Sequence, residues 1–228
     1  MYEIARRVQR KRDHTESFLS FGHPFLGTSR PSFGNLLQYQ ETLLQPEADW
    51  NSGPIVRVEI LTLVQAGSIA IEAESQDSTE LEVGSVHYLC SGPSTEFQVK
   101  NLSRDNPGRY CQIWLDAEGV EAVPRTESLK CEPGGNKREL LLLASGQGDT
   151  TGIPLNQDVA VYHSRLRQNE HLIFETLHSR RVFLAVLSGL VRLEEHRLQD
   201  SDSAMIWREN LIEITAQQRT TLLLIDLP

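Results

Sequence analysis

The segment Gly53–Thr62 has the sequence Gly-Pro-Ile-Val-Arg-Val-Glu-Ile-Leu-Thr, in which apolar and polar residues alternate from Val56 to Ile60. This alternation has the two-residue period of a β-strand with one buried face. The apolar pattern continues to Val64, stops at Gln65-Ala66-Gly67-Ser68 and resumes in Ile69–Ala73. Gly and Ser are common in tight turns, so we expect two neighbouring strands joined by a turn at Gly67.

Short apolar or alternating runs recur along the whole chain at intervals of roughly ten residues, and no segment has a long helical period. These runs are Val86–Cys90, Glu96–Val99, Arg109–Leu115, Val182–Leu187, Leu190–Leu193, Ala204–Trp207, Leu211–Thr215 and Thr221–Leu227. Many short strands at this spacing are typical of a β-sandwich or β-barrel. We therefore predict an all-β fold built from antiparallel strands.

The two halves of the chain can be aligned on each other through their strand breaks. Three pairs of segments match, namely Ala66-Gly67 with Ser188-Gly189, Ser85-Val86 with Ser203-Ala204, and Trp114-Leu115-Asp116 with Leu224-Ile225-Asp226. We interpret this as two copies of one β-barrel unit. The polar segment 121–137, rich in Pro and Gly, is the predicted linker between an N-terminal domain of residues 1–120 and a C-terminal domain of residues 138–228.

The charge of the chain is strongly and unevenly acidic. Among its 228 residues, 22 Lys and Arg against 31 Asp and Glu give a net charge of −9, although residues 1–12 are basic. An acidic body repels phosphate groups, so we expect no nucleic-acid partner. The basic N-terminus is either a solvated strand or a contact for an acidic partner. We expect no membrane span and no secretory signal, because no run of 18 apolar residues is present and residues 1–7 lack an apolar stretch.

The segment Tyr110-Cys111-Gln112-Ile113-Trp114-Leu115 is similar to the Leu-Gln-Ile-Trp segment of the pirin family, and it is the most specific of several such similarities. The others, in chain order, are Ser20–Pro24, Phe33–Leu36, Leu43–Pro46, Val58–Thr62, Leu141–Ser145 and Ile225–Pro228. Asn101–Asp105 and Gln112–Ala117 resemble the metal-lacking bacterial branch of that family. The resemblance implies a bicupin, a monomer in which two antiparallel jelly-roll barrels face each other and exchange terminal strands.

In metal-binding members of the family, one strand carries His-x-His and a second carries His-x-Glu. The resemblance places Gly53, Ile55, Phe97 and Val99 at these four ligand positions. Residues i and i+2 of a strand point to the same face, which lets such pairs reach one metal ion. Glycine has no side chain and the other three are hydrocarbons, so none has a lone pair to donate. We therefore expect no metal ligand here, no other cofactor and no assigned catalytic residue.

Loss of these ligands leaves the barrel itself, so we predict a candidate apolar pocket at the position of the lost metal site. The residues expected to line it are Gly53, Ile55, Phe97, Val99 and Trp114. By alternation, Arg57 and Glu59 are expected on the same face as Ile55, either as an ion pair or as anchors for a ligand. Two outcomes stay open: the side chains fill the barrel as ordinary core, or a small apolar or aromatic ligand with one acidic group binds beside Arg57.

These features favour a metal-free, non-catalytic bicupin that binds a small molecule or a protein partner, in a stress or redox response. The resemblance also implies an alternative, a metal-dependent oxygenase like quercetin 2,3-dioxygenase.

A second alternative is a redox sensor that uses one of Cys90, Cys111 and Cys131. Cys90 and Cys111 lie in predicted strands, where a cysteine is usually a small buried hydrophobic residue, so Cys131 is the expected exposed thiol. Three cysteines without a CxxC pair are consistent with a reducing cytoplasm, which is the predicted location.

Overall fold

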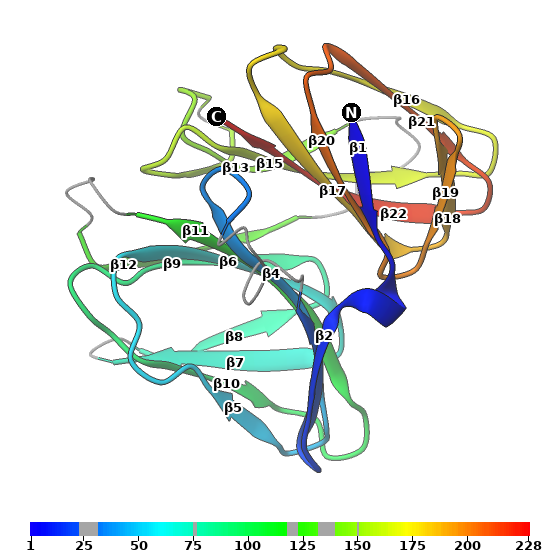
Figure 1. The fold of residues 1–228 in the computed structure, drawn as a ribbon. Helices are drawn as coiled ribbons and strands as arrows, with labels where there is room; N and C mark the ends of the chain where they lie inside the picture. Colours follow the sequence, from blue (N-terminus) through cyan, green and yellow to red (C-terminus); the bar gives the residue numbers. More distant parts are fainter. Residues whose placement is uncertain (23–31, 75–76, 118–122, 132–139, 150) are drawn as a thin grey trace. The chain divides into compact units, whose positions relative to one another are not determined.

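The computed structural model is all-β (Figure 1), and it describes residues 1–22, 32–74, 77–117, 123–131, 140–149 and 151–228. The chain divides into two compact units. The N-terminal unit comprises residues 11–32 and 36–132, and the C-terminal unit comprises residues 1–10, 33–35 and 133–228. The described residues include a short 3-10 turn, η1 (Arg7–Gln9), but no helix with the length and apolarity that a membrane crossing requires.

The N-terminal unit consists of a seven-stranded sheet in the order β12-β9-β6-β11-β4-β3-β2 and a four-stranded sheet in the order β5-β10-β7-β8. The strands of the larger sheet are β2 (Lys11–His14), β3 (Phe18–Gly22), β4 (Leu36–Leu44), β6 (Val58–Ala66), β9 (Ser85–Cys90), β11 (Gly108–Asp116) and β12 (Arg125–Lys130). Those of the smaller sheet are β5 (Asp49–Asn51), β7 (Ser68–Ala73), β8 (Thr79–Glu82) and β10 (Phe97–Asn101).

The C-terminal unit likewise has a seven-stranded sheet in the order β1-β20-β17-β22-β15-β13-β14 and a four-stranded sheet in the order β16-β21-β18-β19. The larger sheet contains β1 (Tyr2–Ala5), β13 (Leu141–Ser145), β14 (Ile153–Pro154), β15 (Ala160–Leu166), β17 (Arg181–Ser188), β20 (Ser203–Trp207) and β22 (Thr220–Leu227). The smaller sheet contains β16 (His171–Glu175), β18 (Leu190–Leu193), β19 (His196–Gln199) and β21 (Leu211–Ala216).

The two units repeat one strand order, which confirms the predicted internal repeat. The run β9-β6-β11-β4 corresponds to β20-β17-β22-β15, and β5-β10-β7-β8 corresponds to β16-β21-β18-β19. The turns between equivalent strands fall at Gly67 and Gly189, whose φ angles are 75° and 98°. Glycine suits both positions because an L-residue with a side chain is strained at such angles.

The edge strands beside β9 and β20 depart from the predicted domain boundaries. In the N-terminal unit this strand is β12 (Arg125–Lys130), which pairs with β9 although it lies in the segment 121–137 that was predicted as a linker. In the C-terminal unit it is β1, which pairs with β20 from Tyr2 opposite Ile206 to Ala5 opposite Ser203. The backbone of β1 pairs with the backbone groups along the edge of β20 that would otherwise be open. Residues 1–10 therefore group with the C-terminal half, whereas the predicted division placed them in the domain 1–120.

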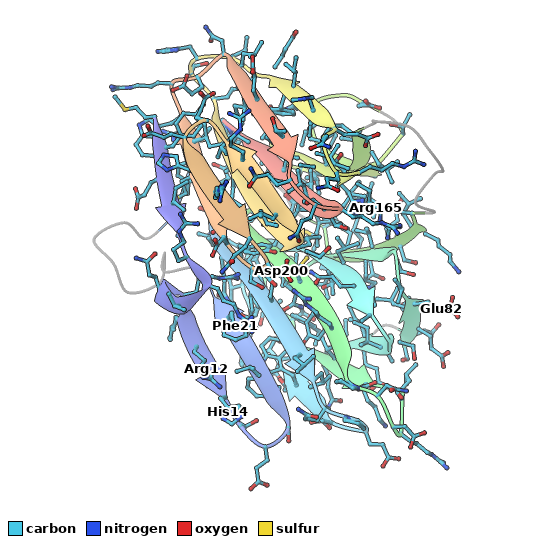
Figure 2. The ribbon with its side chains drawn as sticks, turned by 90° about the vertical axis from the view of Figure 1, so that its right-hand side faces the viewer. Arg12, His14, Phe21, Glu82, Arg165 and Asp200 are labelled. Atoms are coloured by element: carbon cyan, nitrogen blue, oxygen red, sulfur yellow. The ribbon has the colours of Figure 1, made fainter. Side chains whose placement is uncertain are left out.

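The basic N-terminus contributes to this packing. Arg6 forms an ion pair with Asp202 at 2.8 Å, and Arg10 donates a 2.9 Å hydrogen bond to the carbonyl oxygen of Ser201. Both contacts lie inside the C-terminal unit. Arg12 and His14 belong to the exposed strand β2 and are labelled in Figure 2. The first arginines therefore anchor the N-terminal strand, and the later basic residues are solvated.

The core of each unit lies between its two sheets. In the N-terminal unit, Ile60, Leu89 and Tyr110 of the larger sheet belong to the same buried cluster as Ile71 and Val99 of the smaller sheet. In the C-terminal unit, a separate cluster joins β15, β17, β20 and β22 to β16, β18, β19 and β21. Burying apolar faces of both sheets against each other is the main stabilising contribution in such a two-layer unit.

Candidate functional site

Three of the four predicted ligand positions come together in the core of the N-terminal unit. Ile55, Phe97 and Val99 are 7%, 3% and 0% exposed and belong to one hydrophobic cluster. Phe97 and Val99 lie two residues apart on the inner face of β10. Ile55 is held next to β10 by reciprocal backbone hydrogen bonds with Thr95 of 2.8 and 3.0 Å. The position expected for a metal is therefore bounded by hydrocarbon side chains.

Aromatic rings extend this cluster. The ring centroid of Phe97 lies 6.0 Å from that of Trp114 on β11 and 5.7 Å from that of Trp50 on β5. Such tilted and edge-on pairs are favourable geometries for aromatic side chains. Trp114 was predicted at this place, whereas Trp50 was missed because the three-residue strand β5 is too short to show a period.

Gly53 does not lie in a strand. Its φ angle is 64°, and its N–H donates a 2.7 Å hydrogen bond to the side-chain oxygen of Asn51. This left-handed turn breaks the two-residue alternation, so a strand that carries Gly53 and Ile55 on the same face is not formed. Ser52 instead faces β10, and its N–H donates to the carbonyl oxygen of Phe97 at 3.0 Å.

Arg57 and Glu59 lie outside the cluster, contrary to the prediction. Arg57 is exposed, and its φ angle is 50° immediately before β6 begins at Val58. One left-handed residue shifts the alternation by one position, so Val58 and Ile60 face the core together with Ile55. Glu59 is fully buried on the opposite face of β6, where its Oε1 accepts a 2.5 Å hydrogen bond from the hydroxyl of Tyr88. Neither charged residue is placed as an anchor beside Ile55.

A row of uncharged polar side chains crosses the inner face of the seven-stranded sheet, next to the apolar cluster. In register, its members are His87 on β9, Thr62 on β6, Gln112 on β11 and Gln40 on β4. They are 2%, 1%, 0% and 7% exposed, respectively. The Nε2 of Gln112 donates to Oγ1 of Thr62 at 3.3 Å, and the Nε2 of Gln40 donates to Oγ1 of Thr42 at 3.1 Å. Sequence reasoning missed this row because each strand contributes a single member.

Burial keeps the row neutral. It lowers the pKa of His87 to about 4, because the charged imidazolium loses its hydration inside the unit. At neutral pH the ring therefore carries no charge. The neighbours of His87 in register are Thr62 and Ser128, which are neutral as well.

The three cysteines are free thiols, and none of them belongs to the apolar cluster or to the polar row. Cys90 and Cys111 are buried, as predicted, and burial raises the pKa of Cys111 to about 12. Cys131 is half-buried at the end of β12, and burial raises its pKa as well. Because the thiolate is the reactive form, a raised pKa lowers the reactivity of a thiol towards oxidants.

Comparisons with known proteins extend over nearly the whole chain. Residues 142–227 match the family described as quercetinase C-terminal cupin domain. The pirin-like protein YhaK of Escherichia coli (strain K12) is 29% identical over 218 residues, which are 92% of this chain and 89% of YhaK. The quercetin 2,3-dioxygenase of the same strain is 25% identical over 216 residues, which are 94% of this chain and 90% of that enzyme.

The likeness in three dimensions is stronger than the likeness in sequence. The crystal structure of YhhW from Escherichia coli superimposes with a TM-score of 0.91 at 21% identity, and the match covers 100% of this chain and 98% of YhhW. The chain has the two-barrel fold of YhhW, which is described as a bacterial pirin. The antiparallel two-barrel fold predicted from short strands and an internal repeat is thus confirmed.

In this chain the residues at the expected ligand positions do not fit a metal ion. YhhW has also been solved in complex with nickel(II), in a structure that matches this chain with a TM-score of 0.90. In this chain the positions at which ligands are expected from the sequence carry Ile55, Phe97 and Val99, whose side chains have no donor atom. Within the part of the chain that the structure describes, no group of three or more His, Cys, Asp or Glu is arranged to hold a metal ion.

Proposed function

We propose that this bicupin is a metal-free, non-catalytic member of the YhaK-like branch that binds a small molecule in its N-terminal unit. One observation carries the proposal. Ile55, Phe97 and Val99, at the positions where metal-binding relatives are expected to carry ligands, are buried in one apolar cluster. Hydrocarbon side chains cannot coordinate a metal ion. They can bind a ligand, because burial of its apolar surface against them is favoured by the hydrophobic effect.

The surroundings of this cluster favour an aromatic ligand. Trp50 and Trp114 both pack against the ring of Phe97, so a flat molecule would meet aromatic faces and edges. An acidic group on the ligand is no longer required, because Arg57 is exposed and outside the cluster. The expected ligand therefore differs from that inferred from the sequence, which was an apolar or aromatic molecule with one acidic group.

Indole, a small neutral aromatic molecule, tests the proposal in a calorimetric titration. We expect indole to bind the wild-type protein, and Val99→Phe to weaken binding at least about tenfold by filling the space between β10 and the rings. Val83→Phe is the matched control, because Val83 is exposed in a turn, and it should bind indole as the wild type does. If neither indole nor larger neutral aromatic probes bind the wild-type protein, the proposal is contradicted and the result indicates a filled core.

The competing function is a metal-dependent quercetin 2,3-dioxygenase, and it is favoured by the family match of residues 142–227 and by the Escherichia coli relative of that name. Its test is consumption of quercetin by protein that has been incubated with a divalent metal and desalted. We expect no consumption above that of the metal salt alone. Turnover that increases with the amount of bound metal would replace the binding function with the enzymatic one.

A further inference from the structure

Gln112, which is fully buried, and Trp114, which is partly buried, lie on the inner face of β11, and each has a buried polar atom without a hydrogen-bond partner among the described residues. Gln112 uses its Nε2 to reach Thr62, whereas its Oε1 has no donor. Trp114, two residues further on the same face, has a buried Nε1–H without an acceptor. In this orientation of the amide, Nε2 donates to the Thr62 hydroxyl, and the acceptor Oε1 is the atom left without a partner.

Such atoms are uncommon in folded proteins. Roughly nine in ten buried polar groups have a partner, which is either protein or ordered water. A buried donor or acceptor without one is destabilising, because it has lost its bond to water and gained nothing. Two of them on adjacent inward positions of one strand, beside an apolar aromatic cluster, indicate that a further molecule supplies the missing partners.

The two atoms define the chemistry of that molecule. The indole N–H of Trp114 needs an acceptor, and Oε1 of Gln112 needs a donor. The ring of Phe97, with its centroid 6.0 Å from that of Trp114, favours a planar aromatic frame. The polar row beside Gln112 consists of Thr62, Gln40 and neutral His87, so these neighbours offer no positive charge to an anionic ligand.

We propose that the N-terminal unit binds a neutral, planar ligand that accepts a hydrogen bond from Nε1 of Trp114 and donates one to Oε1 of Gln112. A lactam fused to an aromatic ring has this pattern, because its carbonyl oxygen and N–H lie side by side. The inference rests on the proposed small-molecule function and specifies the class of ligand. It assigns Gln112 and Trp114 as the residues that determine specificity.

The bicyclic lactam 2-quinolone and its derivative 1-methyl-2-quinolone are the probes for a calorimetric test. N-methylation removes the donor that Gln112 would accept and keeps the carbonyl. We expect 2-quinolone to bind wild-type protein with one-to-one stoichiometry, and the methylated compound to bind about fivefold more weakly, which is the typical effect of one hydrogen bond.

Variants distinguish the effect of losing the hydrogen bond from the steric effect of the added methyl group. In Gln112→Met, which keeps the length of the side chain, both probes should bind with equal affinity, whereas a steric effect would persist. Gln98→Met is the matched control, because Gln98 lies between the inward residues Phe97 and Val99 on β10 and faces outward, and it should preserve the fivefold preference. Trp114→Phe removes the indole N–H, and it should weaken binding of both probes by a similar factor.

Three results would overturn the inference. Equal binding of both probes to the wild type would show that no donor is recognised, and the small-molecule function would stand with an apolar ligand. A crystal structure grown with 2-quinolone that shows only ordered water on Gln112 and Trp114 would also remove it. Failure of both quinolones and of indole to bind would reject the proposed function together with the inference.

Discussion

The hydroxyl of Tyr88 donates a 2.5 Å hydrogen bond to Oε1 of Glu59 on the neighbouring strand β6. Both side chains are fully buried, and the guanidinium of Arg125 lies 4.7 Å from the centre of the Tyr88 ring. The residues on either side of Glu59, Val58 and Ile60, face the core of the N-terminal unit. Glu59 is therefore a structural residue on the far face of the sheet.

Tyr88→Phe should lower the free energy of unfolding by about 2 kcal/mol, because a buried carboxylate loses a charge-assisted hydrogen bond. Urea denaturation measures this loss. Tyr39→Phe is the matched control, since Tyr39 is equally buried but its hydroxyl lies 3.3 Å from Glu41, whose other oxygen pairs with Arg109 at 3.0 Å. The control should lose only about 0.5 kcal/mol, and equal losses would contradict a structural role for the Tyr88–Glu59 bond.

The burial of His87 predicts that the stability of the protein depends on pH. Burial lowers its pKa from 6.5 to about 4, so between these values the unfolded chain binds the proton and the folded chain does not. Its contribution to stability is thus complete above pH 6.5 and is lost as the pH falls towards 4. In His87→Gln, the decrease in the free energy of unfolding across this range should be smaller by up to about 3 kcal/mol.

The half-buried His163 has a pKa that is also lowered to about 4, so part of this decrease should persist in His87→Gln. His14→Gln is the control, because His14 lies on the exposed strand β2 (Figure 2) and its removal should leave the profile unchanged. A His87→Gln profile parallel to that of the wild type would show that folding does not change the pKa of His87 and would contradict the prediction.

Gly189 and Gly148 provide a matched pair of glycine substitutions. Both have positive φ angles, of 98° and 87°. A Cβ at Gly189 would lie 2.4 Å from the carbonyl oxygen of Arg219, whereas nothing lies within 4 Å at Gly148. Gly148→Ala should therefore cost about 1 kcal/mol from backbone strain alone, and Gly189→Ala clearly more, about 3 kcal/mol. Equal melting temperatures of the two variants would contradict the tight turn between β17 and β18.

The cysteines should resist mild oxidation in the folded protein. Burial raises the pKa of Cys111 to about 12 and also raises that of Cys131, so few thiolates are present at neutral pH. Mass spectrometry after brief treatment with hydrogen peroxide should find all three thiols unmodified, and the same treatment in urea should modify them. A sulfenic acid on any one cysteine of the folded protein would support the redox-sensor alternative.

Most of the fold was predictable from local patterns, because each strand is short and ends at a turn residue. Gly67 and Gly189 mark equivalent turns in the two units, and the sequence predicts both as strand breaks. The partner of the first strand, β1, could not be predicted in this way. Tyr2 lies opposite Ile206, and no pattern in residues 1–10 specifies a strand so far along the chain. Only the family resemblance suggested that terminal strands are exchanged.

The candidate site was predictable in part. Ile55, Phe97, Val99 and Trp114 were expected together and do lie in or against one cluster. The placement of Glu59 was wrong, because a two-residue period carries no sign of a single left-handed residue at position 57. Gln112 was missed as a site residue for another reason: its importance lies in an unpaired amide oxygen, which only the surroundings reveal.

Metal analysis tests most directly whether the N-terminal unit lacks a metal site. The protein is purified without a metal-affinity tag, incubated separately with Fe, Mn, Ni, Cu and Zn salts, desalted and measured by plasma mass spectrometry. We expect less than about a tenth of an equivalent of each metal, because the side chains of Ile55, Phe97 and Val99 carry no donor atom. Retention of about one equivalent of any of the five would contradict the account.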